Sequence, residues 1–334
     1  MCYTLLWRDL LKSQSMLPLN EHYNRMFNIT KMNNQTSYHI HPKHKFKLND
    51  THKPPAFQYH TAYPRNYRFI INHKDACTTM NPFLVLMVPV APHNMAARDA
   101  IRKTWGSEKV VQGEKVLTLF VLGLPSKDIN GLQEEVRQEN LQYDDLIQSN
   151  FIDSYINLTI KTMVIMDWLA THCRIAAYGM KIDSDMFLNI DNLIIMLHKP
   201  GIPKVNYLTG RIARDRPVVR ANDSKWYVPK EMYPDETYPP YTVGMGYLFS
   251  NDLPEKFVEI SKMIPPFNIE DAYIGMCMKQ LGLRITTPPK YPKFRRFKTR
   301  FNRCKFSKVL TYILQTSEDL VRFWRELKKP GPPC

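Results

Sequence analysis

The stretch of sequence that decides the fold is residues 175–188, IAAYGMKIDSDMFL, where an apolar run passes directly into two aspartates. Residues 175–182 predict a strand buried on both faces, because their side chains are almost continuously apolar. Asp183 and Asp185 then stand in the loop where that strand ends. Two carboxylates in such a loop suit a hard divalent cation, although the tripeptide read alone is more simply a pair of solvated turn residues. The apolar residues on both sides favour the cation site.

Buried strands alternate with helices upstream of this stretch. The expected strands are 83–90, 116–122 and 145–151, and the expected helices are 96–104, 128–142 and 155–171. This alternation predicts an α/β fold with a mostly parallel central sheet flanked by helices. Ligands of such sheets bind at the carboxyl ends of the strands, which is where Asp183 and Asp185 are expected to lie.

Beyond residue 205 the pattern is mixed. The expected elements are strands near 206–213 and 243–249, and helices near 253–263, 270–281 and 317–328. Thr316 and Asp319 have the spacing of a capping box, which predicts the start of the last helix.

The composition divides the chain into two parts. Residues 1–75 are rich in His, Asn, Lys and Pro and show little periodicity, which is typical of a disordered stem or linker. Residues 76–334 carry the periodic segments and are expected to form one folded domain. With 334 residues and 44% hydrophobic content, the chain is long enough to bury a large core.

The net charge of +15 indicates an anionic partner such as nucleic acid, a membrane surface or a phosphate-bearing ligand. The densest basic group lies within residues 290–305, where it is interleaved with phenylalanines. A solvated basic loop explains this run more simply than a nucleic-acid patch does, because basic runs are common.

Glycosylation sequons point to a compartment. Five N-x-S/T sequons favour the secretory pathway, and they begin at Asn28, Asn34, Asn49, Asn157 and Asn222. The six cysteines include no CxxC pair, so a cysteine zinc site is not expected, whereas disulfides are permitted in that compartment. No stretch reaches the ~18 apolar residues of a membrane helix.

Two pairs of charged residues have both a functional and a structural interpretation. Arg98 and Arg102 lie four apart on one helical face, where they either grip a phosphate or form ion pairs with carboxylates. Glu270 and Asp271 open a helix, where they either cap it or supply a general base that deprotonates an acceptor hydroxyl.

Aromatic residues and glycines gather within residues 226–247. Trp226 and Tyr227 are adjacent, and Tyr241 precedes Gly244 and Gly246 at the entrance to a strand. Aromatic rings stack on sugar faces, and glycine lets a backbone approach a ligand closely. The alternative is a proline-rich turn that leads into a core strand.

Taken in order, these segments resemble the beta-1,3-galactosyltransferase family over residues 77–328. The resemblance rests on six ordered blocks, each weak alone: Arg98-x-x-x-Arg102-x-Thr104-Trp105, FVLG at 120–123, DSYINLTIK at 153–161, KIDSD at 181–185, YPPYTVGMG at 238–246 and EDAYIG at 270–275. The galactosyltransferase 1 and 2 type also shares SKWYVP at 224–229, with its fifth position variable, and RFW at 322–324.

The resemblance implies a GT-A type fold and a UDP-sugar-dependent hexosyltransferase that uses manganese. Such an enzyme transfers galactose, with inversion, to the 3-hydroxyl of an acceptor sugar such as N-acetylglucosamine on a glycoprotein or glycolipid. Galactose and N-acetylglucosamine transferases share most of these blocks, so the donated sugar stays open.

Carried over residue by residue, the family's site falls on positions already singled out. Asp271 is the implied catalytic base with Glu270 beside it, and Asp183 and Asp185 are the implied metal ligands. The other implied donor-binding residues are Arg98, Arg102, Lys161 and Lys181, and the implied substrate-binding residues are Trp226, Tyr227, Tyr241, Gly244 and Gly246.

The family resides in the Golgi apparatus with a type II signal anchor and a lumenal catalytic domain, yet no apolar run of anchor length is present here. Thr242 stands where the family has a cysteine, which implies a lost disulfide and an unpaired cysteine elsewhere. A family histidine aligns near Ile313, so a metal ligand is expected to be missing. These departures keep a second interpretation open, a weakly active or inactive relative that binds UDP-sugar or glycan.

Overall fold

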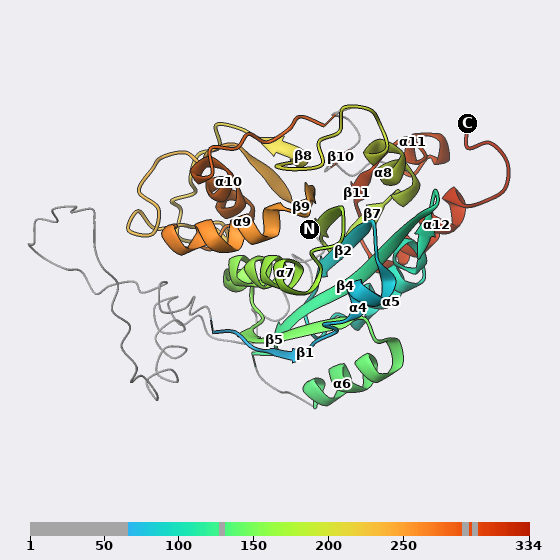
Figure 1. Cartoon of the computed structure of the whole chain (residues 1–334), viewed down its shortest axis with the longest axis horizontal. Coiled ribbons are helices and arrows are strands. Elements are labelled where there is room, and N and C mark those ends of the chain that lie inside the picture. Colours follow the sequence, from blue (N-terminus) through green and yellow to red (C-terminus); the bar gives the residue numbers. More distant parts are fainter. Residues whose placement is uncertain (1–65, 127–130, 289–293, 296–299) are drawn as a thin grey trace, which may run out of the picture. The chain divides into compact units, whose positions relative to one another are not determined.

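The computed structural model describes residues 66–126, 131–288, 294–295 and 300–334, and its main element is a mixed β-sheet (Figure 1). The strand order is β1-β5-β4-β2-β6-β9-β8, with β3 paired to β4. The predicted stem falls outside the described residues up to position 65.

The centre of the sheet is parallel. β2 (Leu84–Pro89) pairs with both β4 (Glu114–Leu124) and β6 (Tyr178–Ile182), and β4 pairs with β5 (Leu146–Ile152). These strands are almost wholly buried, as the continuous apolar runs of β2, β4 and β6 predicted. The predicted α/β class is therefore confirmed, and the carboxyl ends of four parallel strands meet at one edge.

Antiparallel strands extend the sheet at both margins. On one side β9 (Tyr241–Ser250) pairs with β6 and with β8 (Leu208–Ala213). On the other side β1 (Phe69–Ile71) pairs with β5, and β3 (Val110–Val111) pairs with β4. Because β1 lies within the segment predicted as linker, the sheet begins before residue 76. A strand of three residues is too short to show a period in the sequence.

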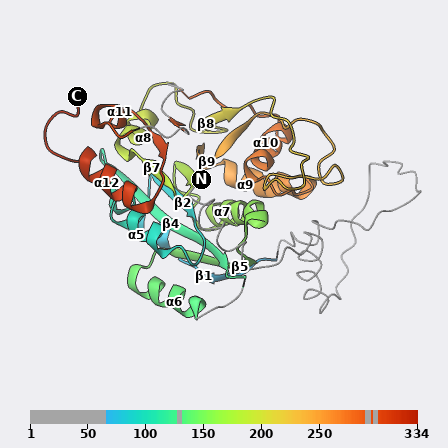
Figure 2. The ribbon, with the colours of Figure 1, turned by 180° about the vertical axis from the view of Figure 1, so that it is seen from behind.

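Helices cover both faces of the sheet, as predicted. One core lies against α7 (Leu158–His172), α9 (Leu253–Ile260) and α10 (Glu270–Gln280), and the other against α5 (Met95–Arg102), α8 (Ile190–Leu197) and α12 (Ser317–Leu327). Figures 1 and 2 show these two groups on different sides of β2 and β4. The amide of Asp319 donates to Thr316 Oγ1 at 3.2 Å, so the predicted cap of α12 is confirmed.

The remaining helices are shorter or lie at the margin: α4 (Ala76–Met80), α6 (Leu132–Tyr143), α11 (Arg303–Phe306), and the 3-10 turns η1 (Trp105–Ser107), η2 (Tyr155–Asn157) and η3 (Ser261–Met263). In the part of the chain that the structure describes, no helix combines the length and apolar character needed to cross a bilayer.

A small second sheet follows the acidic loop. β7 (Met186–Leu188) pairs antiparallel with β11 (Thr311–Ile313), which pairs in parallel with β10 (Phe294–Arg295). The amide of Leu314 donates to the carbonyl oxygen of Asp185 at 2.9 Å. The segment near Ile313, where the sequence predicted that a family histidine is missing, therefore lies directly against the acidic loop.

Two disulfides cross-link the described chain. Cys77 pairs with Cys173 and joins α4 to the end of α7, and Cys304 pairs with Cys334. Cys277 is a buried thiol outside these bonds. Thr242 is fully buried, and its hydroxyl has no hydrogen-bond partner among the described residues.

Gly275 allows α10 to pack on the entrance to β9. A Cβ at this position would lie 2.7 Å from the Tyr241 Cβ and 2.9 Å from the Pro240 carbonyl oxygen. Because neither neighbour is the end of a flexible side chain, we expect Gly275→Ala to lower the free energy of unfolding by roughly 1–3 kcal/mol. Chemical denaturation measures this, with Lys279→Ala on the exposed part of α10 as the control. Equal stability of the two variants would contradict the close packing.

Candidate active site

Lys181, near the end of β6, joins three segments at the carboxyl edge of the sheet. Its ammonium lies 2.7 Å from Asp183 Oδ1, 2.8 Å from Glu270 Oε1 and 2.5 Å from the Gly244 carbonyl oxygen. Burial alone would lower the pKa of this ammonium, but the charges of Asp183 and Glu270 raise it well above its ordinary value. A charged lysine therefore holds the acidic loop, β9 and α10 together.

Gly244 makes room for this arrangement. A Cβ at Gly244 would lie 2.5 Å from Glu270 Oε1, so a side chain here would displace the carboxylate. The Gly244 amide also donates to Asp271 Oδ2 at 2.9 Å. The sequence predicted that a ligand would approach this glycine closely. In the structure the carboxylates of Glu270 and Asp271 make that approach. A Cβ at Gly246 would meet the core side chain of Met180 at 3.4 Å, so this glycine faces the sheet.

Glu270 and Asp271 are neighbours with different surroundings. Glu270 is 7% exposed and accepts hydrogen bonds from Lys181, Thr162 at 3.0 Å and Tyr247 at 3.3 Å. Asp271 is partly exposed and accepts two backbone N–H groups. Burial and the neighbouring charge of Glu270 raise the pKa of Asp271 to about 7. Burial also raises the pKa of Glu270, although the charge of Lys181 opposes the rise. A pKa near neutral suits Asp271 to the role of a general base.

Asp183 and Asp185 lie together at the end of β6, in the loop predicted from the sequence. Asp183 is bound by Lys181, whereas burial and the charge of Asp183 raise the pKa of Asp185 to about 6. The oxygen donors and the crowded negative charge suit a divalent cation. Within the described ranges, no group of three or more His, Cys, Asp or Glu side chains is arranged to hold a metal. These two carboxylates would need ligand or water oxygens to complete a coordination shell.

Lys161 on α7 binds the ends of three parallel strands together. Its ammonium lies 2.7 Å from Asp153 Oδ2 and donates to the Val90 carbonyl oxygen at 2.8 Å. Asp153 Oδ2 also accepts the Gly123 amide at 2.8 Å. Val90 follows β2, Gly123 belongs to β4 and Asp153 follows β5. These contacts position the edge of the sheet, and a direct role for Lys161 in donor binding stays a prediction.

Arg98 and Arg102 form ion pairs with carboxylates of the protein. Arg98 is 1% exposed, contacts both carboxylate oxygens of Glu139 at 2.6 Å, and donates to two carbonyl groups in the loop after β2. Arg102 contacts Glu139 at 2.7 Å and Asp145 at 2.7 Å. Of the two interpretations of this pair, the ion-paired one describes the structure. Arg98 shapes the loop after β2, and these contacts lend no support to phosphate binding by either arginine.

The aromatic residues predicted to bind substrate differ in exposure. Tyr241 lies against Gly275 of α10, and the Tyr227 carbonyl accepts a hydrogen bond from Asn268 Nδ2 at 3.0 Å. Both tyrosines are partly buried, whereas Trp226 is 52% exposed. Of these three residues, Trp226 presents the largest share of its surface to solvent.

Three residues with interactions at the carboxylates were not among the predicted site residues. Thr162 and Tyr247 donate to Glu270, and the charge of Asp271, after burial, raises the pKa of Tyr155 to about 12. Thr162 directly follows Lys161, so the block at 153–161 pointed to its neighbourhood. The role of Tyr247 depends on its antiparallel pairing with Lys181, which no local pattern predicts.

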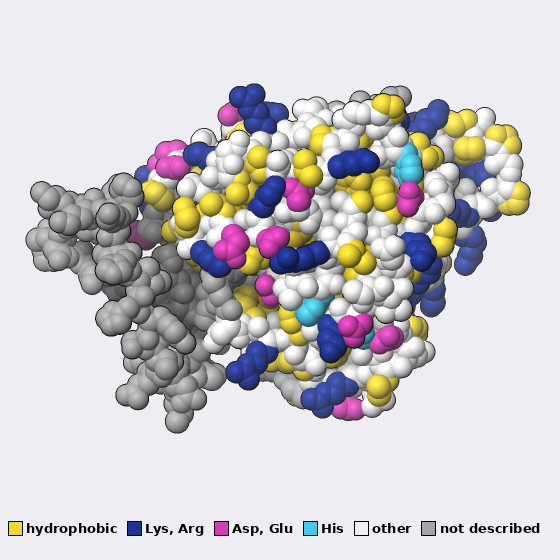
Figure 3. Space-filling model, viewed as in Figure 1, with side chains coloured by type: hydrophobic (Ala, Val, Ile, Leu, Met, Phe, Trp, Pro, Cys, Tyr) yellow, Lys and Arg dark blue, Asp and Glu magenta, His cyan; other side chains and the backbone are white. Residues whose placement is uncertain are grey.

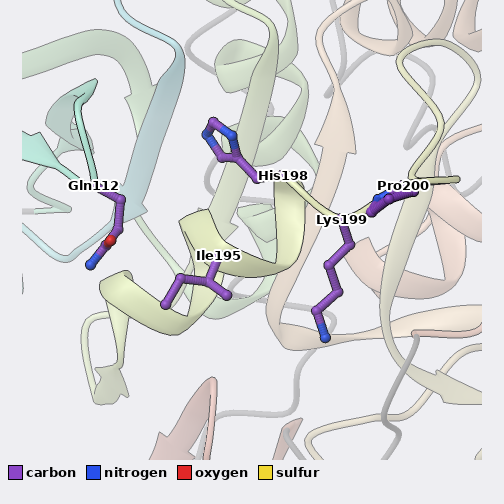
Figure 4. Close-up of a pocket in the computed structure, with 5 residues that line it drawn as sticks. All are labelled: Gln112, Ile195, His198, Lys199 and Pro200. Carbon is purple, nitrogen blue, oxygen red and sulfur yellow. The ribbon is translucent and has the colours of Figure 1, made fainter.

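Two surface pockets are lined by residues other than these carboxylates. One has a volume of about 370 Å³ and is lined by residues near β3 and the end of α8 (Figure 4): Gln112, Ile195, His198, Lys199 and Pro200. The other, of about 640 Å³, lies between β11 and α12 and includes Ile313. The carboxylates of Asp183, Glu270 and Asp271 line neither of them.

A mixed α/β sheet with carboxylates and a buried lysine at the carboxyl edge of its parallel strands defines the class: an α/β protein with polar side chains gathered at the edge where such sheets bind their ligands. The family follows from comparison with known proteins. The family described as Galactosyltransferase matches residues 96–289, more than half of the chain. The chain belongs to the galactosyltransferase family.

Two relatives illustrate the similarity. The chain is 41% identical to beta-1,3-galactosyltransferase 2 of Pongo abelii over 273 residues, which are 80% of this chain and 64% of that protein. It is 39% identical to beta-1,3-galactosyltransferase 1 of Mus musculus over 265 residues, which are 79% of each. The match thus spans less than two thirds of the first relative's length.

Among solved structures, a glycosyltransferase involved in the glycosylation of the major capsid of PBCV-1 aligns with 73% of this chain and 99% of its own. The identity is 10% and the TM-score is 0.39.

The raised pKa of Asp271 makes stability depend on pH. The folded protein keeps the Asp271 proton up to about pH 7, whereas the ordinary pKa is 3.8. The folded state therefore binds more protons between these values, so the free energy of unfolding falls as pH rises from about 4 to about 7. We expect Asp271→Asn to remove this part of the slope, which denaturation of both proteins across that pH range measures. Identical slopes would show that the carboxyl is not perturbed.

Proposed function

We propose that the chain is a UDP-sugar-dependent hexosyltransferase. It moves galactose from UDP-galactose to the 3-hydroxyl of an acceptor sugar such as N-acetylglucosamine, with inversion at the anomeric carbon. The observation that carries the proposal is the different environment of two adjacent carboxyls, Glu270 and Asp271, in a chain of this family. The names of the two relatives support the donated sugar and the linkage.

Asp271 acts as the general base in this reaction. It accepts the proton of the acceptor hydroxyl while the oxygen attacks the anomeric carbon, and the bond to UDP breaks in the same displacement. A single displacement inverts the anomeric configuration. The Gly244 amide orients the Asp271 carboxylate, and Lys181 keeps Glu270 in place beside it.

Asp183 and Asp185 are the residues that would hold Mn²⁺. When bound, the cation supplies Lewis-acid stabilisation of the diphosphate leaving group. Because only two carboxylates of the described chain are gathered at this loop, we infer that the cation binds well only together with the donor diphosphate.

The setting of the reaction is proposed to be the Golgi lumen. The sequons and the two disulfides fit an oxidising secretory compartment, and a type II anchor is what the family implies. The partners are then the UDP-sugar donor and a glycan on a glycoprotein or glycolipid.

A relative that binds UDP-sugar or glycan without turnover is the second candidate, and the observation favouring it is Ile313 beside the acidic loop. A nucleic-acid-binding role has less support. Much of the basic run 290–305 lies outside the described residues, and on the face in Figure 3 basic side chains are scattered among acidic ones.

A transfer assay with UDP-galactose, Mn²⁺ and an N-acetylglucosamine acceptor tests the proposal. We expect the rate to rise with pH through about 7 as Asp271 loses its proton. Asp271→Asn should lower kcat by roughly 100-fold or more while UDP binding is retained. Glu231→Gln, at an exposed carboxylate, is the matched control and should keep full activity. Wild-type protein that binds the donor yet forms no product would favour the second candidate.

Replacing Ile313 tests the account of the metal site. We expect Ile313→His to tighten Mn²⁺ binding without nucleotide by roughly tenfold or more, because an imidazole adds a third protein ligand. Calorimetric titration with Mn²⁺ alone measures this, and Ile313→Phe is the control because its ring carries no ligand nitrogen. Equal affinities for the two variants would mean that this position does not reach the cation.

A further inference from the structure

The helix α10 begins without a capping side chain. Its N-cap residue is Ile269, whose side chain makes no hydrogen bond, and the next two residues are Glu270 and Asp271. Isoleucine cannot accept the first backbone N–H groups of a helix, as Ser, Thr, Asp or Asn would in its place. The first turn of α10, which carries both carboxylates, therefore depends on contacts from other elements.

Two of these contacts come from the first turns of α7. Thr159 Oγ1 donates to the carbonyl oxygen of Phe267 at 2.6 Å. Thr162 Oγ1 donates to Glu270 Oε2 at 3.0 Å. Both threonines are buried, and they lie three positions apart on one face of the helix. α7 thus holds the segment that leads into α10 as well as the first residue of α10.

Lys161 lies between these threonines and contacts the other half of the site. Its ammonium binds Asp153 and the Val90 carbonyl oxygen at the ends of the parallel strands. Residues within one turn of an α-helix keep fixed relative positions. α7 therefore fixes the start of α10 relative to the carboxyl edge of the parallel sheet.

Neither Lys181 nor Tyr247 can take the place of the Thr162 hydroxyl at Glu270. The three N–H groups of the Lys181 ammonium already have three acceptors. Tyr247 has one hydroxyl proton, and it already reaches Glu270 Oε2 at 3.3 Å. Because Glu270 is 7% exposed, loss of the Thr162 hydroxyl would leave Oε2 short of a donor where water has little access.

We propose that Thr162 is a positioning residue for the transfer reaction. Its hydroxyl fixes the Glu270 carboxylate and, through the first turn of α10, holds Asp271 where it meets the acceptor hydroxyl. This inference rests on the proposed function, in which Asp271 takes the proton. Glu270 and Asp271 are consecutive, and Gly244 contacts both of them, so a shift of one carboxylate moves the other.

Thr162→Val tests the positioning role, because valine keeps the branched shape of threonine and lacks its hydroxyl. With UDP-galactose, Mn²⁺ and an N-acetylglucosamine acceptor, we expect kcat of the full chain to fall by roughly tenfold or more, because a misplaced base slows the chemical step. The acceptor KM and the dissociation constant of UDP should stay within roughly threefold of the wild type. Thr162→Ser keeps the hydroxyl and should recover most of the rate. Thr162→Ala removes the hydroxyl with less volume and takes the place of Thr162→Val if valine prevents folding.

Thr118→Val is the matched control. Thr118 is 3% exposed on β4, and its hydroxyl has no hydrogen-bond partner among the residues that the structure describes. The exchange therefore removes a buried hydroxyl that holds nothing, and full kcat is expected. Equal kcat in the wild type and Thr162→Val, or a loss that Thr162→Ser shows to the same extent, would overturn the positioning role.

Amide hydrogen exchange separates the positioning role from the transfer reaction. The Gly244 amide donates to Asp271 Oδ2, so its exchange rate reports whether Asp271 stays in place. We expect this amide to exchange roughly tenfold faster in Thr162→Val than in the wild type or Thr118→Val. Unchanged exchange would overturn the positioning role. Faster exchange, in a protein whose wild type transfers no galactose, sustains the positioning role and removes the proposed reaction. Transfer with an unchanged kcat in Thr162→Val sustains the reaction and removes the positioning role.

Discussion

The buried ammonium of Lys181 is the contact on which the site depends. Its acceptors belong to the acidic loop, β9 and α10, which are distant in the sequence. A charge removed from water is tolerated only when such acceptors satisfy it. The lysine therefore turns three separate motifs into one arrangement, in which it holds Glu270 while the Gly244 amide holds Asp271 beside it. Removing any one acceptor would leave a buried charge incompletely compensated.

The long elements were predictable because each carries its own pattern. Nearly continuous apolar runs identified β2, β4 and β6, and long apolar-rich segments identified α7 and α10 to within a few residues. The short strands β1, β7 and β11 were not predictable, because three residues show no period and such strands exist only through pairing with distant segments. The helix α8 was missed for another reason: it begins at Ile190, two residues after β7 ends at Leu188, so no turn in the sequence separates the strand from the helix.

The site was predictable where local sequence determines it. The strand before Asp183 places that aspartate at the sheet edge, and a helix start places Glu270 and Asp271 side by side. Charge alone did not separate ligand binding from internal pairing, because the partner of Arg98 is Glu139, which is 41 residues away. Likewise Tyr247 reaches Glu270 only through the register of β6 and β9, a property of the folded sheet.

β6 and β9 are antiparallel neighbours in the sheet, and they come from different parts of the chain. The site is therefore encoded by two separate stretches of the gene. Residues up to the acidic loop form the parallel strands, and those beyond residue 205 form β8, β9, α10 and the loop that carries Trp226. In evolutionary terms, substitutions that reshape this loop can accumulate while the earlier stretch is conserved, provided that Gly244 and Glu270 continue to satisfy Lys181. A lineage built on this plan can diversify one half of its binding surface and inherit the other unchanged.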